Sequence, residues 1–102
     1  MKKLLEKDIQ RQIIQYLELK KYLVIKINNV GIMKPNGSFI PPRQKGVSDL
    51  ICCKNGRFIA IEVKSDSGIL SAYQKAFLDE VERRGGYSIV LRSLNDAIKA
   101  FK

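Results

Sequence analysis

An Asn-Gly pair in the middle of the chain constrains the fold more than any other feature. Asn55-Gly56 separates two runs rich in strand-forming residues, 47–53 and 57–64, and this pattern predicts a hairpin with a two-residue turn. In the resulting ladder the pairs are Lys54 with Arg57, Cys53 with Phe58, Ile51 with Ala60, and Asp49 with Glu62. Both faces of the hairpin carry apolar residues, so we expect helices to cover the sheet on both sides.

This register places two carboxylates opposite each other at the open end of the hairpin. Directly opposed residues have Cβ atoms about 5 Å apart, and like charges there repel. Asp49 and Glu62 therefore call for a cation, and Lys64 projects from the same face as Glu62. The alternative is a surface ion pair of Glu62 with Lys64, with Asp49 in a turn. We favour the metal site because the other residues on that face are apolar.

Two acids and a lysine around a divalent ion suit phosphodiester hydrolysis. A hard divalent cation neutralises charge at the phosphate and supplies a hydroxide-like nucleophile. Mg²⁺ takes oxygen ligands and keeps waters, so Asp49 and Glu62 would hold it, with the Val63 carbonyl as a third oxygen. Lys64 would orient or deprotonate the attacking water, or stabilise the pentacovalent state.

Length and composition describe an ordinary folded protein. The chain has 102 residues, of which 45% are apolar and 28% charged, and these values suit a single domain spanning 1–102. No segment is long and apolar enough to cross a membrane. Residues 1–6 reach an acid before any long apolar run, which argues against a signal peptide. We therefore expect a cytoplasmic location.

The charge points to a polyanionic partner. Nineteen Lys and Arg against ten Asp and Glu give a net charge of +9, which favours nucleic acid over the alternative of solubility alone. The loop 28–46 is longer than a plain connection and includes three basic residues, Lys34, Arg43 and Lys45. We interpret it as a flap that contacts phosphates, with a short edge strand at 38–40. The alternative is a solvated surface loop.

Cysteine and histidine usage narrows the chemistry. Cys52 and Cys53 are neighbours on a strand and face opposite ways, so we expect two buried thiols in a reducing compartment rather than a zinc site. The chain has no histidine. Nucleophile pairs built on histidine, and nucleases with a histidine base, are therefore excluded. Any hydrolysis must rest on carboxylates, lysine and a metal.

Periodicity and capping signals predict the other elements. These are helices at 3–19, 71–84 and 93–101 and strands at 22–27 and 87–91, the last strand parallel to 57–64. The predicted buried stripes are Leu5, Ile9, Ile13, Tyr16 and Leu17 in the first helix, and Tyr73, Ala76, Phe77 and Val81 in the second. Glu6 lies on the edge of the first stripe, where it either faces the sheet or complements the helix dipole. The order α-β-β-β-α-β-α indicates an α/β fold with a mixed central sheet flanked by helices on both faces.

Two tetrapeptides carry a family resemblance. Residues 46–49 (GVSD), followed by 61–64 (IEVK), resemble the PD-(D/E)XK nuclease motif. The chain as a whole resembles the virus-type replication-repair nuclease domain (VRR-NUC) from near the first helix to the last strand. The resemblance includes Glu6 and the Ser71–Gln74 pair. Ser48 stands where the family often has proline, a residue that shapes backbone rather than chemistry.

The resemblance implies a restriction-endonuclease-like core and a nuclease that uses Mg²⁺ or Mn²⁺ and leaves 5′-phosphates. It assigns Asp49 and Glu62 as metal ligands, Lys64 as the catalytic lysine, Glu6 as an accessory acid, and Gln74 as a residue near the substrate phosphate. For Gln74 the alternative is a helix cap alone. Stand-alone family members occur in phages and prophages, which implies the bacterial host cytoplasm, and some cut branched DNA such as Holliday junctions as dimers.

The leading hypothesis is therefore a structure-selective DNA endonuclease acting as a homodimer, because symmetric cutting of two strands needs two active sites. A second hypothesis keeps the chemistry but takes linear, flap or single-stranded DNA. A third is a non-catalytic nucleic-acid-binding module of the same fold, and a fourth is a basic structural protein. No base-reading pattern stands out to predict sequence specificity.

Overall fold

The predicted hairpin forms with the predicted register. In the computed structural model, which describes residues 4–28, 31–40 and 44–102, β4 (Leu50–Lys54) pairs antiparallel with β5 (Arg57–Val63). Asn55 and Gly56 have φ of 54° and 76°, the two positive values that a tight type I′ turn requires. The ladder runs from Lys54 opposite Arg57 to Leu50 opposite Ile61, so Asp49 lies one residue before the paired strand begins.

Two further strands complete a mixed four-stranded sheet of order β1-β4-β5-β6. Strand β1 (Leu23–Lys26) is antiparallel to β4, and β6 (Tyr87–Leu91) is parallel to β5. The parallel pair is possible because α2 (Ala72–Arg83) crosses over between β5 and β6. This arrangement confirms the predicted α/β class and the mixed central sheet.

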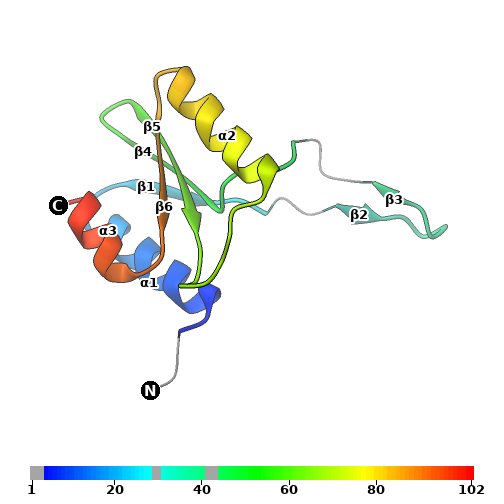
Figure 1. The fold of residues 1–102 in the computed structure, drawn as a ribbon, viewed down its shortest axis with the longest axis horizontal. Coiled ribbons are helices and arrows are strands. Elements are labelled where there is room, and N and C mark those ends of the chain that lie inside the picture. The colour runs from blue at the N-terminus through cyan, green and yellow to red at the C-terminus, as the bar shows by residue number, and fades with distance from the viewer. Residues whose placement is uncertain (1–3, 29–30, 41–43) are drawn as a thin grey trace.

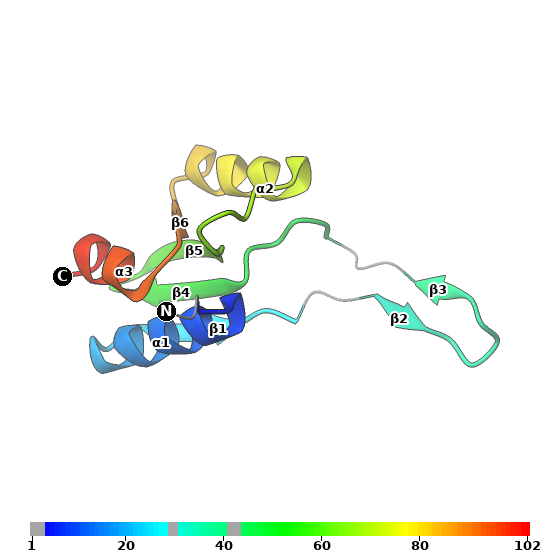
Figure 2. The same cartoon turned by 60° about the horizontal axis from the view of Figure 1, so that its bottom comes forward.

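Helices cover both faces of the sheet, as the apolar pattern predicted (Figure 2). Helices α1 (Glu6–Leu19) and α3 (Leu94–Ala100) pack on one face around a core that includes Ile13, Leu17, Leu50 and Ile61. Helix α2 packs on the other face over a smaller cluster of Ala60, Leu78 and Val81. None of the helices in the described ranges has the length and apolar character needed to span a bilayer.

The smaller cluster on the α2 face leaves one of the two cysteines that we expected to be buried exposed. Cys52 is buried, and burial raises the pKa of its thiol to about 11, but Cys53 is exposed. Cys53 lies opposite Phe58 next to the hairpin turn, and Phe58 is itself 46% exposed. Neither residue belongs to the cluster that α2 covers, so the Cys53 side chain stays exposed.

The buried stripe of α2 was predicted one residue out of place. Tyr73 and Ala76 are exposed, whereas Leu78 and Val81 are buried and Phe77 is partly buried. The observed stripe has the spacing 74, 77, 78, 81, and its first position is the polar Gln74. The predicted stripe of α1 holds except at Leu5, the N-cap residue, which is 60% exposed.

The loop between β1 and β4 contains a separate ribbon. Strands β2 (Ile32–Met33) and β3 (Phe39–Ile40) pair antiparallel and stand out from the body of the molecule (Figure 1). The strand expected at 38–40 is therefore β3, but its partner is β2, and neither strand joins the main sheet. Strand β2, which was not predicted, is only two residues long and is too short to leave a periodic pattern.

Replacement of Leu17 should destabilise the fold strongly. Its side chain is fully buried, so Leu17→Ala should lower the free energy of unfolding by about 2–5 kcal/mol. Leu19→Ala is a matched control in the same helix, because Leu19 is 79% exposed and its truncation should change stability by less than about 0.5 kcal/mol. Urea denaturation measures both variants, and equal effects would contradict this packing.

Candidate active site

Asp49 is anchored to the strands on both sides of it. Its backbone carbonyl accepts a hydrogen bond from the Ile27 amide at 2.9 Å, which extends the β1–β4 ladder. Its side-chain Oδ2 accepts from the Val63 amide at 2.9 Å, across the hairpin at the end of β5. The carboxylate therefore reaches over to the residue next to Glu62.

Glu62 is a buried acid with an unsatisfied oxygen. It is 1% exposed, and its Oε1 accepts a hydrogen bond from Gln74 Nε2 at 3.2 Å. Within the described residues, its Oε2 is buried and has no hydrogen-bond partner. Buried polar atoms are nearly always paired, because an unpaired one loses its hydration without replacement. When Glu62 is ionised, its Oε2 therefore has no donor among the described residues.

Burial and neighbouring carboxylates disfavour the ionised form of Glu62. The pKa of Glu62 is raised to about 8, chiefly by burial. A hydrogen bond with the Asp49 carboxyl group, which requires that one of the two acids be protonated, and the negative charge of Asp49 contribute to the same increase. Glu6 also raises this pKa, whereas the charge of Lys64 lowers it. The carboxyl groups of Asp49 and Glu62 therefore compete for negative charge, and either a shared proton or a cation relieves that competition.

Gln74 connects the start of α2 to Glu62. It forms the predicted capping box, in which Ser71 Oγ accepts from the Gln74 amide at 3.1 Å and Gln74 Oε1 accepts from the Ser71 amide at 2.8 Å. The other end of the same side chain, Nε2, is free to donate to Glu62. The cap therefore orients the amide toward the acid, and Gln74 is both a helix cap and a neighbour of the site.

Lys64 and Glu6 border the pair of acids. The Lys64 amide donates to the Leu91 carbonyl at 3.0 Å, which continues the pairing of β5 with β6 by one residue. Glu6 is exposed in the first turn of α1, and its Oε2 accepts from the Ser65 amide at 3.4 Å. The acid of helix α1 therefore reaches the end of the sheet, in a position that also suits the helix dipole.

A close backbone contact holds the segment before Asp49. Gly46 has φ of +77°, and a Cβ built there would lie 2.3 Å from the Tyr73 carbonyl group. No other residue fits this approach to α2 without displacing backbone. Ser48 is buried, and its hydroxyl donates to the Leu50 carbonyl at 2.9 Å. This local bond constrains the backbone directly before Asp49.

The residues expected to bind nucleic acid do not all gather here. Lys45 lies at the start of α2, with its Nζ 5.0 Å from the centroid of the Tyr73 ring. Lys34 is at the turn of the β2–β3 ribbon, away from the sheet, where its amide donates to the Ser38 carbonyl. Arg43 lies outside the described residues.

The pair of acids offers only part of a metal coordination shell. In the portion of the chain that the structure describes, no three Asp, Glu or Cys side chains come together to hold an ion. Asp49 and Glu62 would therefore leave the remaining positions to a backbone carbonyl, water or substrate oxygen, as Mg²⁺ sites commonly do.

A mixed sheet between helices, with acids and a lysine where the central strands end, has the architecture of the PD-(D/E)XK nuclease class. The VRR-NUC domain family matches residues 5–95, so the chain belongs to this family of nuclease domains. DNA is the substrate class that this membership implies.

Comparison with solved structures gives the same fold. One structure described as a VRR_NUC domain is 21% identical, aligns over 92% of this chain and 90% of its own, and has a TM-score of 0.69. A similarity at this identity supports the fold alone. No curated protein sequence matches the chain.

Removing the charge of Glu62 should change how stability depends on pH. Because the folded-state pKa is raised from 4.5 to about 8, the folded protein binds the proton more tightly than the unfolded chain. This contribution is fully present below pH 4.5 and is lost as the pH rises through about 8. Without metal, Glu62→Gln should therefore gain stability relative to wild type as the pH increases.

The measurement is the melting temperature at about pH 5.5 and about pH 8.5 in EDTA. A relative gain of about 1 kcal/mol corresponds to roughly 4–8 °C in a domain of this size. Glu18→Gln, at an exposed position of α1, is the control and should follow wild type. A constant difference between Glu62→Gln and wild type at both pH values would contradict the raised pKa.

Proposed function

We propose that this domain is a metal-dependent DNA endonuclease in which Asp49 and Glu62 hold Mg²⁺ or Mn²⁺. The observation that carries the proposal is the buried Glu62 Oε2, which has no partner among the described residues and belongs to an acid crowded by Asp49. A divalent cation satisfies this oxygen and removes the repulsion between the two carboxylates. Hard oxygen donors are the ligands that these ions select.

The remaining ligands follow from the hydrogen bonds. Asp49 uses Oδ2 for the Val63 amide, so we assign its other oxygen to the ion. The Val63 carbonyl is the proposed third protein ligand, and Glu6 is an accessory acid for a second ion or a bound water. Gln74 holds the Glu62 carboxylate in place by donating from Nε2 to Glu62 Oε1. We assign Gln74 a second role as a contact to the substrate phosphate.

The chemistry divides between the ion and the lysine. A cation bound at these acids would neutralise the scissile phosphate and lower the pKa of a bound water. Lys64, the other charged residue of the motif, comes two residues after Glu62, and its charge lowers the pKa of that acid. Its amine orients the attacking water or stabilises the negative charge that develops at phosphorus. No histidine is present to take either role.

Loss of either charged group should abolish cleavage. Lys64→Ala and Asp49→Ala should each lower the cleavage rate of DNA by about 100-fold or more, because each removes a group that acts on the phosphate. DNA binding should remain measurable in both variants, since most of the +9 charge is retained.

Gel assays in Mg²⁺ measure cleavage, and fluorescence anisotropy measures binding. Lys99→Ala and Asp79→Ala, at exposed positions of α3 and α2, are matched controls that should cut like wild type. Wild-type cleavage by Lys64→Ala or Asp49→Ala would reject the assignment.

For the substrate, we propose branched DNA such as a four-way junction, cut by a homodimer. The support is the small basic domain with one proposed site per chain, because two symmetric cuts need two sites. Lys34, Arg43 and Lys45 are the proposed phosphate contacts outside the site. The setting that we propose is the cytoplasm of a bacterial or phage-infected cell, with residues 1–102 acting as one domain.

A panel of four-way junctions, flaps, nicked duplexes, linear duplexes and single strands tests this choice. The proposal expects junction cleavage about tenfold or more faster than linear duplex, and a dimer by light scattering. Faster cleavage of flaps, linear duplex or single strands would favour a nuclease of the same chemistry with another target. Salt-sensitive binding without any cleavage in Mg²⁺ or Mn²⁺ would instead indicate a non-catalytic binding module.

A further inference from the structure

Arg92 donates hydrogen bonds to three carbonyl groups of the turn at residues 65–68, which directly follows Lys64. Arg92 comes directly after β6, and its Nη1 donates to the carbonyls of Ser65 at 2.7 Å, Gly68 at 2.8 Å and Asp66 at 3.4 Å. The turn itself is closed by a hydrogen bond from the Gly68 amide to the Ser65 carbonyl at 3.1 Å. Three carbonyl oxygens that converge in this way repel each other unless a cation lies among them.

The 65–68 turn lies against the Lys64 side chain. A Cβ added at Gly68 would lie 3.2 Å from Lys64 Cδ and 3.3 Å from Lys64 Cβ, so the aliphatic stem of the lysine packs on the Gly68 backbone. The turn begins at Ser65, which directly follows Lys64. The Ser65 amide donates a hydrogen bond to Glu6 Oε2. Lys64 is thus supported from one side by a loop whose shape depends on Arg92.

The backbone links the same two residues a second time. The Lys64 amide donates to the carbonyl of Leu91, the residue before Arg92. The Arg92 amide in turn donates to Asp96 Oδ2 at 3.0 Å, which ties it to the first turn of α3. The backbone at Arg92 is therefore held on both sides. Its planar guanidinium loses little conformational entropy when it forms the hydrogen bonds to the turn.

We propose that Arg92 is a positioning residue for Lys64, acting through the 65–68 turn and the Gly68 backbone. The proposal rests on the proposed function, because the role of Lys64 in cleavage does. Arg92 touches neither the acids nor the substrate in this role. It holds the turn that limits where the lysine amine can go.

Kinetics of Arg92→Ala test the positioning. Misplacement of a catalytic group with binding intact should lower kcat by about 10- to 100-fold, with KM changed less than about threefold. The pH profile of kcat should shift as well, and Arg92→Lys should recover part of the rate, because its ammonium retains hydrogen bonds but not the fork.

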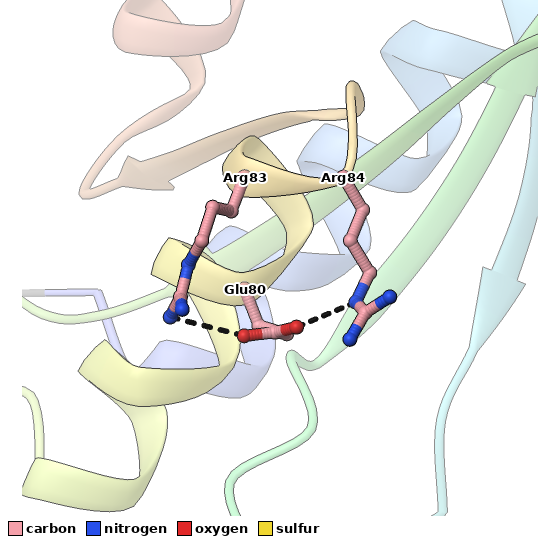
Figure 3. Close-up of polar contacts among 3 residues, drawn as sticks. All are labelled: Glu80, Arg83 and Arg84. Atoms are coloured by element: carbon pink, nitrogen blue, oxygen red, sulfur yellow. Dashed lines mark hydrogen bonds and ion pairs between the residues drawn. The ribbon is translucent and has the colours of Figure 1, made fainter.

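Two arginines of α2 provide matched controls. Arg83 and Arg84 both pair with Glu80 on the surface (Figure 3), and their side chains are 74% and 80% exposed. Arg83→Ala and Arg84→Ala remove the same charge as Arg92→Ala without contact to the 65–68 turn. They should leave kcat and its pH profile unchanged. An equal loss of kcat in all three variants would overturn the proposal.

A labelling experiment separates the positioning from the cleavage activity. Trace acetylation of the metal-free protein, read by mass spectrometry, should change at Lys64 by about threefold or more in Arg92→Ala while the exposed Lys99 stays constant. Unchanged labelling of Lys64 overturns the proposal. If the wild type cuts no substrate, the proposed function fails, but the labelling still decides whether Arg92 positions the lysine.

Gly68→Ala tests the same contact from the other side and does not depend on the folding of an Arg92 variant. Its φ lies outside the left-handed region, so alanine adds only the methyl group, which must displace the Lys64 stem by a few tenths of an ångström. The expected result is a lowered kcat and altered Lys64 labelling, with urea unfolding close to wild type. Wild-type kcat and labelling in Gly68→Ala would overturn the proposal.

Discussion

The site depends on one costly feature, an acid that the fold buries at the end of its central strand. Glu62 sits where β5 is covered on both faces, with one oxygen satisfied by Gln74 and the other by nothing in the described chain. Desolvation and the neighbouring Asp49 both disfavour its charge. A protein of this size has little stability to spare for such a group. Its presence is therefore best explained by a ligand that reverses the penalty, and a divalent cation does so.

The rest of the fold holds this acid and its partner in register. The Asn55-Gly56 turn sets the hairpin, the hairpin sets Asp49 beside the end of β5, and the Val63 amide fixes the Asp49 carboxylate. On the α2 side, the absence of a side chain at Gly46 lets the chain pass against the start of the helix that presents Gln74. Together these contacts bring Asp49, Glu62 and Gln74 to one end of the sheet.

Much of this could be predicted because it follows from short-range rules. The turn type, the ladder up to Leu50 and Ile61, and the Ser71–Gln74 cap depend on residues close in sequence. The parallel direction of the last strand follows from the helix that crosses over before it. The stripe of α2 could not be placed correctly, because Gln74 occupies an apolar position of the helix in order to reach Glu62. The exposure of Cys53 depends on how far α2 extends over the sheet, which periodicity does not report.

The hydrogen bonds from Arg92 to the 65–68 turn could not be predicted from the sequence either. Arg92 is 28 residues from Lys64 in the chain by its numbering, and no motif connects them. An arginine that follows a strand is common on protein surfaces, so its presence in the sequence predicts no particular role. The role of Arg92 follows only from the three carbonyl groups that its Nη1 contacts in the structure. Of the β2–β3 ribbon only β3 was predicted; β2 was missed for a different reason, since a strand of two residues is too short to leave a periodic signal.

The central claim is that Asp49 and Glu62 together bind a divalent cation, and calorimetric titration with Mn²⁺ tests it most directly. Because the pKa of Glu62 is raised to about 8, we expect this acid to hold a proton at about pH 7 in the metal-free protein and to release it when the ion binds. Titrations in buffers of different ionisation enthalpy should show release of close to one proton per ion, and Asp49→Asn should abolish binding. Mn²⁺ binding that releases no proton, or that is unchanged in Asp49→Asn, would contradict the account.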